Sequence, residues 1–230
     1  MYKNHKISIV IPCYNEEKGI APTIKSIPSW VDEVLVVDNN CYDQTAPIAR
    51  RLGATVIRES QQGYGAACRR GLKTVKGDIV ITSDADGTYP LRTIDKIIDN
   101  LLENDIDFVG GNRFPVANKS AMPWPNFLGN IILTLAMNLL TGKFIKDSQT
   151  GMWALRQPIL KKMRLSSNSM SFSEEIKMEA LCNPEIRYGE YHIDYFDRLG
   201  NSKLRRLRDG IPNLLFLFKK RWQIYRRKHQ

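Results

Sequence analysis

The chain has 230 residues, 43% hydrophobic and 25% charged, which is ordinary for a globular protein and excludes disordered and fibrous classes. The net charge of +10 comes almost wholly from residues 203–230, which hold ten Lys or Arg residues and one acid, so the tail is expected to meet anions such as a membrane surface, a lipid phosphate or nucleic acid. Four cysteines without a CxxC pair argue against a zinc ribbon or a disulfide framework and favour a reducing compartment.

Short apolar, β-branched runs alternate with helical patterns through the first half of the chain. The predicted strands are 7–11, 34–37, 55–57, 78–82 and 108–110. The predicted helices between them are 17–27, 45–52, 66–75 and 91–103. Strands that recur after intervening helices imply right-handed βαβ units and a mostly parallel sheet.

The pattern changes after about residue 115, where Pro115, Pro123 and Pro125 interrupt the chain. An apolar helix is predicted over 127–140. The remaining expectations are a short element at 151–155, helices at 157–163 and 173–181, the second capped by Ser173, and a strand at 191–196. No internal repeat or low-complexity linker occurs, so residues 1–202 are predicted to form one catalytic domain, followed by a tail at 203–230.

The tail is predicted to be helical and interrupted near Pro212. Its apolar residues recur at helical spacing and form one stripe, comprising Leu207, Ile211, Leu214, Leu215, Phe218, Trp222 and Tyr225. Lys and Arg residues crowd around the stripe. Two interpretations remain open: a basic amphipathic helix that lies in a bilayer interface, or a helix that packs on its own domain with a solvated outer face.

A membrane span is not expected. No stretch approaches the roughly 18–20 apolar residues that a spanning helix needs, and the longest candidate, 131–140, is half that length and contains Asn138. The N-terminus lacks the apolar core and the cleavage site of a signal peptide. The protein is therefore predicted to be cytoplasmic and peripherally associated with the membrane.

Acidic residues follow three predicted strands. The first strand continues into Pro12, Tyr14 and Glu16, the second ends at Asp38, and the fourth is followed by Asp84 and Asp86. In parallel α/β sheets, ligands lie beyond the carboxyl ends of strands. Two carboxylates separated by one residue can bind Mg²⁺ or Mn²⁺, which in turn holds substrate phosphates. The alternative for Asp86 is a simple Asp-Gly turn with Gly87.

Other catalytic signatures are missing. The cluster at 63–71 has cysteine where a dinucleotide fingerprint needs its third glycine, and no P-loop or serine elbow occurs. The three histidines are scattered. Arg113, Arg198 and Lys203 are candidates for phosphate binding, with ordinary surface charge as the alternative.

Several blocks in order make the chain resemble family 2 glycosyltransferases with the GT-A fold, in the branch of dolichyl-phosphate and polyprenyl-phosphate sugar synthases. The blocks are SIVIPCYNEE, VLVVDNNCYDQT, GYGAACRRGL, DIVITSDADGTYP, GGNRF, DSQTGMWALR and RLGNSKL. The resemblance implies a mostly parallel central sheet with flanking helices, followed by the basic amphipathic C-terminal helix. Asn126 departs from the pattern, because many relatives carry an arginine there that binds the acceptor phosphate.

The resemblance also implies roles for individual residues. The nucleotide-sugar would be held by Pro12, Tyr14, Glu16, Asp38, Asp84, Arg198 and Lys203. Asp84 and Asp86 would bind the metal, Mg²⁺ or Mn²⁺. The implied catalytic residues are Asp86, Arg113, Asp147 and Gln149, with Glu175 beside the same cavity.

The implied reaction moves a hexose or N-acetylhexosamine, with inversion, from a nucleotide-sugar to dolichyl or polyprenyl phosphate at the cytoplasmic face of a membrane, for glycan or glycoprotein biosynthesis. A UDP-sugar is favoured over GDP-mannose. No nucleic-acid partner is expected, because the domain outside the tail is nearly neutral and has carboxylates at its strand ends. A homo-oligomer is left open. The alternatives are a glycosyltransferase with another acceptor and a nucleotidyltransferase.

Overall fold

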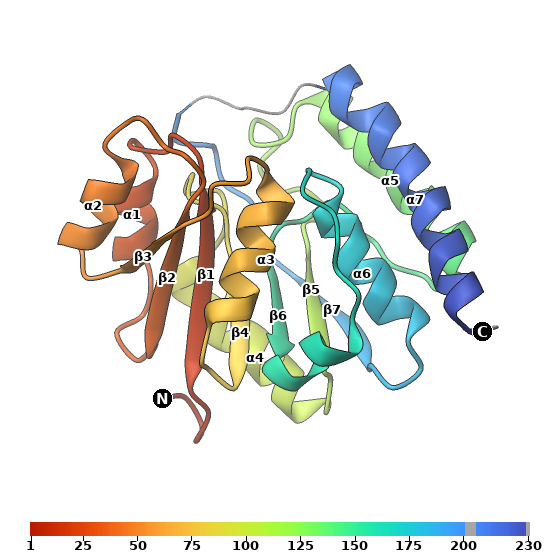
Figure 1. Cartoon of the computed structure of the whole chain (residues 1–230), viewed down its shortest axis with the longest axis horizontal. Helices are drawn as coiled ribbons and strands as arrows, with labels where there is room; N and C mark the ends of the chain where they lie inside the picture. Colours follow the sequence, from red (N-terminus) through yellow and green to blue (C-terminus); the bar gives the residue numbers. More distant parts are fainter. Residues whose placement is uncertain (201–205, 229–230) are drawn as a thin grey trace.

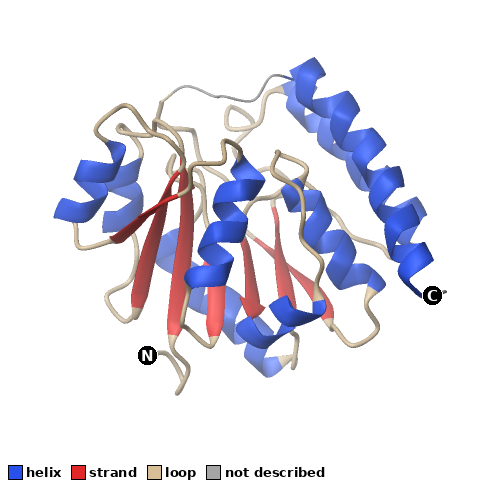
Figure 2. Cartoon of the chain, in the orientation of Figure 1, coloured by secondary structure: helices blue, strands red, loops and turns tan. Residues whose placement is uncertain are grey.

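The computed structural model describes residues 1–200 and 206–228 and contains a seven-stranded sheet flanked by helices (Figures 1 and 2). The strand order is β3-β2-β1-β4-β6-β5-β7, and only β6 runs antiparallel to its neighbours. The strands are β1 (Ile7–Cys13), β2 (Glu33–Asp38), β3 (Thr55–Arg58), β4 (Ile79–Thr82), β5 (Phe108–Asn112), β6 (Trp153–Arg156) and β7 (Tyr188–His192). The predicted mostly parallel sheet is confirmed.

Helices cover both faces of this sheet. They are α1 (Ile20–Lys25), α2 (Thr45–Arg51), α3 (Tyr64–Thr74), α4 (Ile94–Glu103), α5 (Trp124–Thr141), α6 (Phe172–Cys182) and α7 (Arg206–Lys228), with short 3₁₀ turns η1 (Leu91–Thr93) and η2 (Gln157–Lys162). The predicted α-helices are present with ends shifted by a few residues, except that the helix predicted over 157–163 is the 3₁₀ turn η2 and the one predicted over 91–103 begins with η1.

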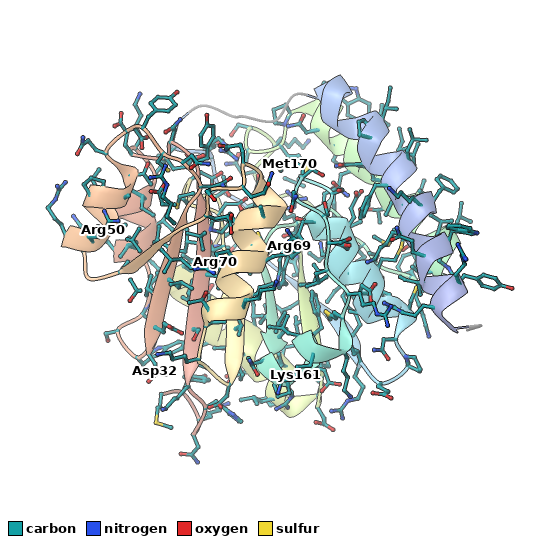
Figure 3. The ribbon with its side chains drawn as sticks, viewed as in Figure 1. Asp32, Arg50, Arg69, Arg70, Lys161 and Met170 are labelled. Carbon is teal, nitrogen blue, oxygen red and sulfur yellow. The ribbon has the colours of Figure 1, made fainter. Side chains whose placement is uncertain are left out.

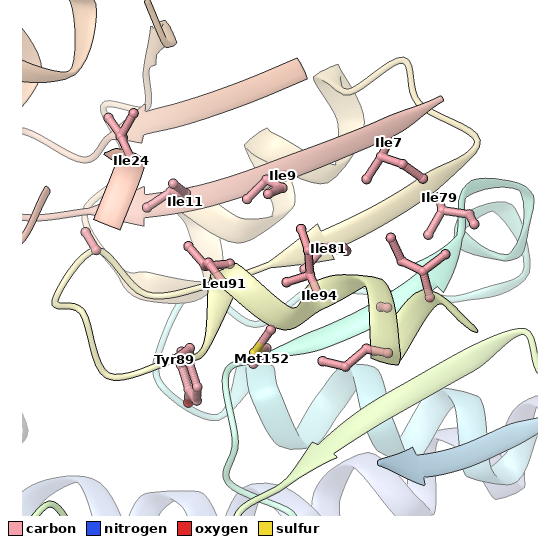
Figure 4. Packing of buried hydrophobic residues seen from close by; sticks show 14 of the residues in the cluster. Ile7, Ile9, Ile11, Ile24, Ile79, Ile81, Tyr89, Leu91, Ile94 and Met152 are labelled. Carbon is pink, nitrogen blue, oxygen red and sulfur yellow. The ribbon is translucent and has the colours of Figure 1, made fainter. Parts of the chain in front are cut away.

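The two-residue period of the strands sorts their side chains into two cores. Ile7, Ile9 and Ile11 of β1 pack with β4 residues against α1, α2 and α4, as Figure 4 shows for part of this cluster. Val10 points to the other face, where α3 and α6 cover the sheet. Gly71 of α3 permits the close approach, since a Cβ there would lie 2.3 Å from Val10 Cγ1. Burial of both faces explains why these strands are almost continuously apolar.

A third, smaller core joins α5, α6 and α7 beside the sheet. Leu133 and Met137 of α5, Met178 of α6, and Leu217 and Ile224 of α7 are buried together. Arg221 Nε of α7 donates to the carbonyl oxygen of Leu140 at 2.6 Å, near the C-terminal end of α5. Figure 1 shows α5 and α7 side by side at the edge of the molecule. The tail helix therefore packs on its own domain.

The structure corrects several local predictions. The last strand covers Tyr188–His192 rather than 191–196, because its register is set by pairing with β5, Phe108 opposite Tyr188. Helix α6 begins at Phe172, so Ser173 lies inside the helix and is not its cap. Helix α7 continues through Pro212 without a break. The predicted domain boundary at 202/203 lies outside the described residues.

Candidate functional site

The polar segments that follow β1, β2 and β4 meet at the carboxyl edge of these parallel strands. Cys13 at the end of β1 is paired with Asp38 at the end of β2, and β4 lies on the other side of β1. The residues that follow these strands are therefore neighbours in space although they are distant in sequence. This edge carries two adjoining cavities.

The smaller cavity, about 190 Å³, lies directly over the ends of β1 and β4. It is lined by Pro12, Cys13, Tyr14, Glu16, Asn39, Gln62, Tyr64, Ala67, Asp84, Ala85, Asp86, Met170 and Arg198. Asp38 is absent from this lining, because its Oδ1 accepts the backbone N–H of Cys41 at 2.8 Å. Four of the predicted nucleotide-binding residues, Pro12, Tyr14, Glu16 and Asp84, thus share one cavity with Arg198.

The larger cavity, about 990 Å³, extends from this point toward α5 and α7. It shares Tyr64, Asp84, Met170 and Arg198 with the smaller cavity, so the two meet at these side chains. Figure 3 labels Met170 near the N-terminal end of α3. The lining also includes Tyr89, Arg113, Asn126, Asn130, Gln149, Ser173, Tyr195, Gly210 and Asn213. The N-terminal halves of α5 and α7 therefore form one wall of this cavity.

Asp84 lies where the two cavities meet, and Asp86 lines the smaller one. The Asp-Gly turn considered as an alternative is present, since Asp86 Oδ1 accepts the N–H and hydroxyl of Thr88 at 3.0 and 2.7 Å, and Gly87 has φ of 78°. The turn leaves Asp86 Oδ2 buried, and the guanidinium of Arg198 forms an ion pair with it at 2.6 Å. Burial, and then the charge of Asp86, raise the pKa of Asp84 to about 7.

This pair fits a hard divalent cation. It supplies carboxylate oxygens, one of them the buried Asp86 Oδ2 that faces Arg198, and a cation would relieve the repulsion that raises the pKa of Asp84. Among residues 1–200 and 206–228, no group of three or more His, Cys, Asp or Glu side chains could hold a metal. Two protein ligands suit Mg²⁺ or Mn²⁺, which take further oxygens from substrate phosphates and water.

Arg198 reaches the site from the segment after β7. Its Nη2 lies 2.6 Å from Asp86 Oδ2, and its Nη1 lies 3.5 Å from Glu16 Oε1. Burial alone lowers the pKa of this guanidinium, but the carboxylates of Asp86, Asp84 and Glu16 outweigh it, so the pKa of Arg198 is raised. A permanent positive charge therefore faces both cavities. Lys203, predicted to act with Arg198, lies outside the described residues.

Arg113 and Asp147 form a buried ion pair at the floor of the larger cavity. Arg113 Nε donates to Asp147 Oδ2 at 2.7 Å and Nη2 donates to Oδ1 at 2.9 Å, in the two-point geometry that makes such pairs strong. Asp147 also accepts from Asn130 Nδ2 and from three backbone N–H groups, those of Arg113, Gln149 and Thr150. Burial alone would raise the pKa of Asp147, but Arg113 and these donors lower it instead. Asp147 is fully buried and does not line the cavity, so it positions Arg113.

Glu175 is not beside the cavity as the resemblance implied. It is fully buried and turned toward α7, where its Oε1 accepts from Lys220 Nζ at 2.9 Å. Its carboxylate also accepts the N–H groups of Ser166 and Ser167. Its role in this structure is to join α6, α7 and the preceding loop.

Sequence reasoning missed several cavity residues. Asn39, Gln62, Tyr64, Tyr89 and Tyr195 line one or both cavities. Tyr64 belongs to the glycine cluster, and its position between two glycines at a helix start could have drawn attention to it. Asn39 and Tyr89 belong to blocks that carry the family resemblance, whereas Gln62 and Tyr195 come from segments without a pattern of their own. Only the fold brings these residues together.

Comparisons with known proteins agree with this geometry. Residues 8–164 match the family model described as Glycosyl transferase family 2. The chain is 32% identical over 209 residues to the dolichyl-phosphate hexose transferase of Haloferax volcanii, a match that covers 88% of each protein. It is 30% identical over 218 residues to the low-salt glycan biosynthesis hexosyltransferase Agl6 of the same organism. That match covers 92% of this chain but 52% of the relative, so the chain spans about half the length of Agl6.

Solved structures match as well. Glucosyl-3-phosphoglycerate synthase of Mycobacterium tuberculosis, in complex with Mn²⁺, UDP and phosphoglyceric acid, superimposes with a TM-score of 0.70 at 21% identity, covering 93% of this chain and 78% of that chain. A second complex of that enzyme contains Mg²⁺ and UDP, with a TM-score of 0.68. These likenesses concern the fold, and the predicted GT-A fold is confirmed.

Proposed function

Because the chain belongs to glycosyl transferase family 2, we propose that it transfers a hexose or N-acetylhexosamine from a nucleotide-sugar to dolichyl or polyprenyl phosphate. One observation carries the proposal: two cavities meet at Asp84 and Arg198, so a nucleotide in the smaller one would place its diphosphate beside the larger one. The names of the relatives support a hexose and a dolichyl phosphate. The alternative function, that of a nucleotidyltransferase, has no support from the family match.

The donor we propose is a UDP-sugar rather than GDP-mannose. The smaller cavity is only about 190 Å³, which suits the smaller pyrimidine base. The side chain of Asn39 fixes part of its wall, with Nδ2 donating to the carbonyl oxygens of Glu59 and Gln61 at 3.0 and 2.7 Å. Structural neighbours solved with UDP support the same choice.

Asp84 and Asp86 would hold Mg²⁺ or Mn²⁺, whose positive charge would offset the negative charge that develops on the departing diphosphate. Arg198 would add a second positive charge from the other side of Asp86. The neighbours solved with Mn²⁺ or Mg²⁺ support this assignment. The residues Pro12, Tyr14 and Glu16 would hold the nucleoside.

Arg113 would bind the acceptor phosphate. Asp147 occupies its Nε and Nη2, and Arg113 still lines the larger cavity, so the rest of the guanidinium faces the ligand. A phosphate monoester has a second pKa of about 6 and is largely ionised at neutral pH, so it needs no strong base to become a nucleophile. Its oxygen would attack the anomeric carbon as the bond to the diphosphate breaks. In-line attack would invert the anomeric configuration.

A transfer assay tests the proposal. The protein would be incubated with Mg²⁺ or Mn²⁺, a panel of radiolabelled nucleotide-sugars and polyprenyl phosphate, and the label would be counted in the organic phase. We expect label from a UDP-hexose or UDP-N-acetylhexosamine to become lipid-soluble. Transfer only to water-soluble phosphorylated acceptors would overturn the lipid acceptor and favour a glycosyltransferase with another acceptor.

The metal site should show a pH dependence with a defined sign. The pKa of Asp84 is about 7, so below pH 7 this carboxyl is mostly protonated. It must lose that proton before it can bind a cation. We expect the affinity for Mn²⁺ to fall by about tenfold for each pH unit below 7 and to level off above it. Calorimetric titration between pH 5.5 and 8.5 measures this, and a constant affinity over that range would contradict it.

The same pKa shift affects the stability of the metal-free protein, and there the effect of rising pH is unfavourable. Between about pH 4, the ordinary pKa of an aspartate, and pH 7, the unfolded chain is ionised at Asp84 while the folded chain keeps its proton. The contribution of Asp84 to stability therefore declines as the pH rises through this window.

The peripheral membrane association that we propose rests on α5 and α7. Each presents an exposed apolar stripe at helical spacing, from Trp124, Leu128, Ile132, Leu135 and Leu139 on α5 and from Ile211, Leu215, Phe218, Trp222 and Tyr225 on α7. Residues 124–146 and 210–228 contain no acid. Arg226 lies over the ring of Trp222, 4.8 Å from its centroid. Apolar stripes bordered by cations suit an anionic bilayer surface.

The two stripes also explain how a lipid would reach the site. Asn126 and Asn130 of α5 and Asn213 of α7 line the larger cavity, while the outer faces of the same helices would rest on the bilayer. A polyprenyl phosphate could then enter the cavity with its chain still in the membrane.

In the part of the chain that the structure describes, no helix is long and apolar enough to cross a membrane.

Substituting Trp222 by Glu should weaken this association. The change removes an interfacial aromatic residue and adds a charge that anionic lipid repels, so we expect co-sedimentation with phosphatidylserine-containing vesicles to fall about tenfold or more. Gln223→Glu is the matched control, because it adds the same charge to an exposed neighbouring position without removing an apolar group. Equal binding by the two variants would refute the role of the stripe.

A further inference from the structure

The amide group of Gln149 is held in one orientation at the edge of the larger cavity. Its Nε2 donates to Glu174 Oε1 at 2.7 Å and to Ser148 Oγ at 2.9 Å. Both amide protons are therefore used inside the protein. The atom left for the cavity is the carbonyl oxygen, Oε1, which can only accept a hydrogen bond.

Glu174 determines this orientation. It is fully buried on α6, and its Oε2 has no hydrogen-bond partner in the described part of the chain, so its one polar contact is with Gln149. Burial raises the pKa of Glu174 to about 8, although Gln149 and Lys177 oppose the rise. With the proton on Oε2, which has no partner among the described residues, Glu174 Oε1 can still accept from Gln149.

Lys177, one turn further along α6, holds the backbone of the same loop. Its buried Nζ donates to the carbonyl oxygens of Asp147, Ser148 and Thr150 at 3.1, 3.0 and 3.0 Å. These three bonds use every proton of the ammonium group. The loop that carries Gln149 is thus fixed through its backbone by Lys177 and through its side chain by Glu174.

A fixed hydrogen-bond acceptor selects its ligand group. An ionised phosphate carries only acceptor oxygens and would be repelled by the carbonyl oxygen of Gln149, whereas a sugar hydroxyl can donate to it. We propose that Glu174 is a positioning residue that fixes Gln149 as the acceptor for one hydroxyl group of the transferred sugar. This inference rests on the proposed function, and it makes the Gln149–Glu174 pair a determinant of sugar specificity.

The test compares the natural donor with its monodeoxy analogues. One analogue lacks the hydroxyl that Gln149 binds. For this analogue we expect the unmodified protein to show a kcat/KM about tenfold or more below that for the natural donor. In Glu174→Gln, the new amide can pair with Gln149 in either orientation, so rejection of that one analogue should fall to about threefold or less. Rejection of the other analogues should be unchanged, which a general loss of structure would not produce.

Four further variants complete the design. Gln149→Met should lose the same discrimination, and adding Glu174→Gln to it should change nothing further, because both act through one hydrogen bond. Glu185→Gln is the control, since this exposed carboxylate pairs with Lys162 away from both cavities. If Glu174→Gln does not fold, Glu174→Asp retains the carboxyl but withdraws it from Gln149.

The inference and the proposed function fail in different ways. Full discrimination in a folded Glu174→Gln or Glu174→Asp variant would overturn the inference while transfer to lipid continued. If the unmodified protein transferred nothing to polyprenyl phosphate, the proposed function would fail, and calorimetric binding of the same donor analogues with Mn²⁺ would still measure the discrimination.

Discussion

Replacing Asp86 by asparagine is expected to reduce sugar transfer by on the order of 10³-fold while the protein remains folded. The asparagine carbonyl can still accept the N–H and hydroxyl of Thr88, so the turn at Gly87 is preserved. What disappears is the negative charge on the buried Oδ2 that faces Arg198. Lipid-extractable label in the transfer assay measures the loss, and thermal unfolding confirms the fold.

Two further variants separate charge from structure at this position. Asp86→Ala also removes the turn contact to Thr88 and is expected to abolish transfer with an additional loss of stability. Asp99→Asn removes an aspartate that pairs with Lys3 on the outer side of α4, and should leave transfer unchanged. Full turnover of Asp86→Ala in the presence of a chelator would refute the metal role.

Replacing Lys220 by methionine should lower the free energy of unfolding by about 3–5 kcal/mol. Only 3% of this lysine is exposed, and its Nζ lies 2.9 Å from Glu175 Oε1 and 2.8 Å from Glu179 Oε1. Without the ammonium group, two carboxylates remain buried between α6 and α7, and among the side chains that the structure describes Arg227 pairs with Glu179. Urea unfolding followed by circular dichroism measures the change.

The chain offers a matched control one residue away. Lys219→Met makes the same substitution at an exposed position of α7 and should change stability by less than about 0.5 kcal/mol. Adding Glu175→Gln and Glu179→Gln to Lys220→Met should recover part of the loss, because the buried charges are then removed. Equal effects of the lysine substitutions at 219 and 220 would show that the network does not hold α7.

The sequence determined the main architecture and the chemical centre of the site. Buried parallel strands must be apolar on both faces, so β1 and β4 could be recognised from composition alone, and the polar residues after them had to meet at one edge. That is how Glu16, Asp84 and Asp86 could be predicted to belong together. Arg198 was implied by the family resemblance, and the structure places all four around one cavity. Their actual roles in catalysis remain predictions.

Tertiary packing decided what local pattern does not encode. The strand Tyr188–His192 has few apolar residues, and its register depends on its neighbour β5. Asp38 and Asn39 are adjacent in sequence, yet only the amide lines the cavity because the carboxylate turns back to its own backbone.

The tail helix shows the same limit most clearly. The sequence left open whether its apolar stripe meets a bilayer or packs on the domain, and the structure buries Leu217, Lys220 and Ile224 while it leaves most of the stripe exposed. Helical periodicity identifies the faces of a helix but not which of them is covered. Glu175 and Glu179 on α6 decided which face is covered, because their negative charges pair with the positive charge of Lys220. They lie 41 and more residues from Lys220 in sequence. Such long-range pairing is a property of the folded chain, because only the fold brings these groups within contact distance.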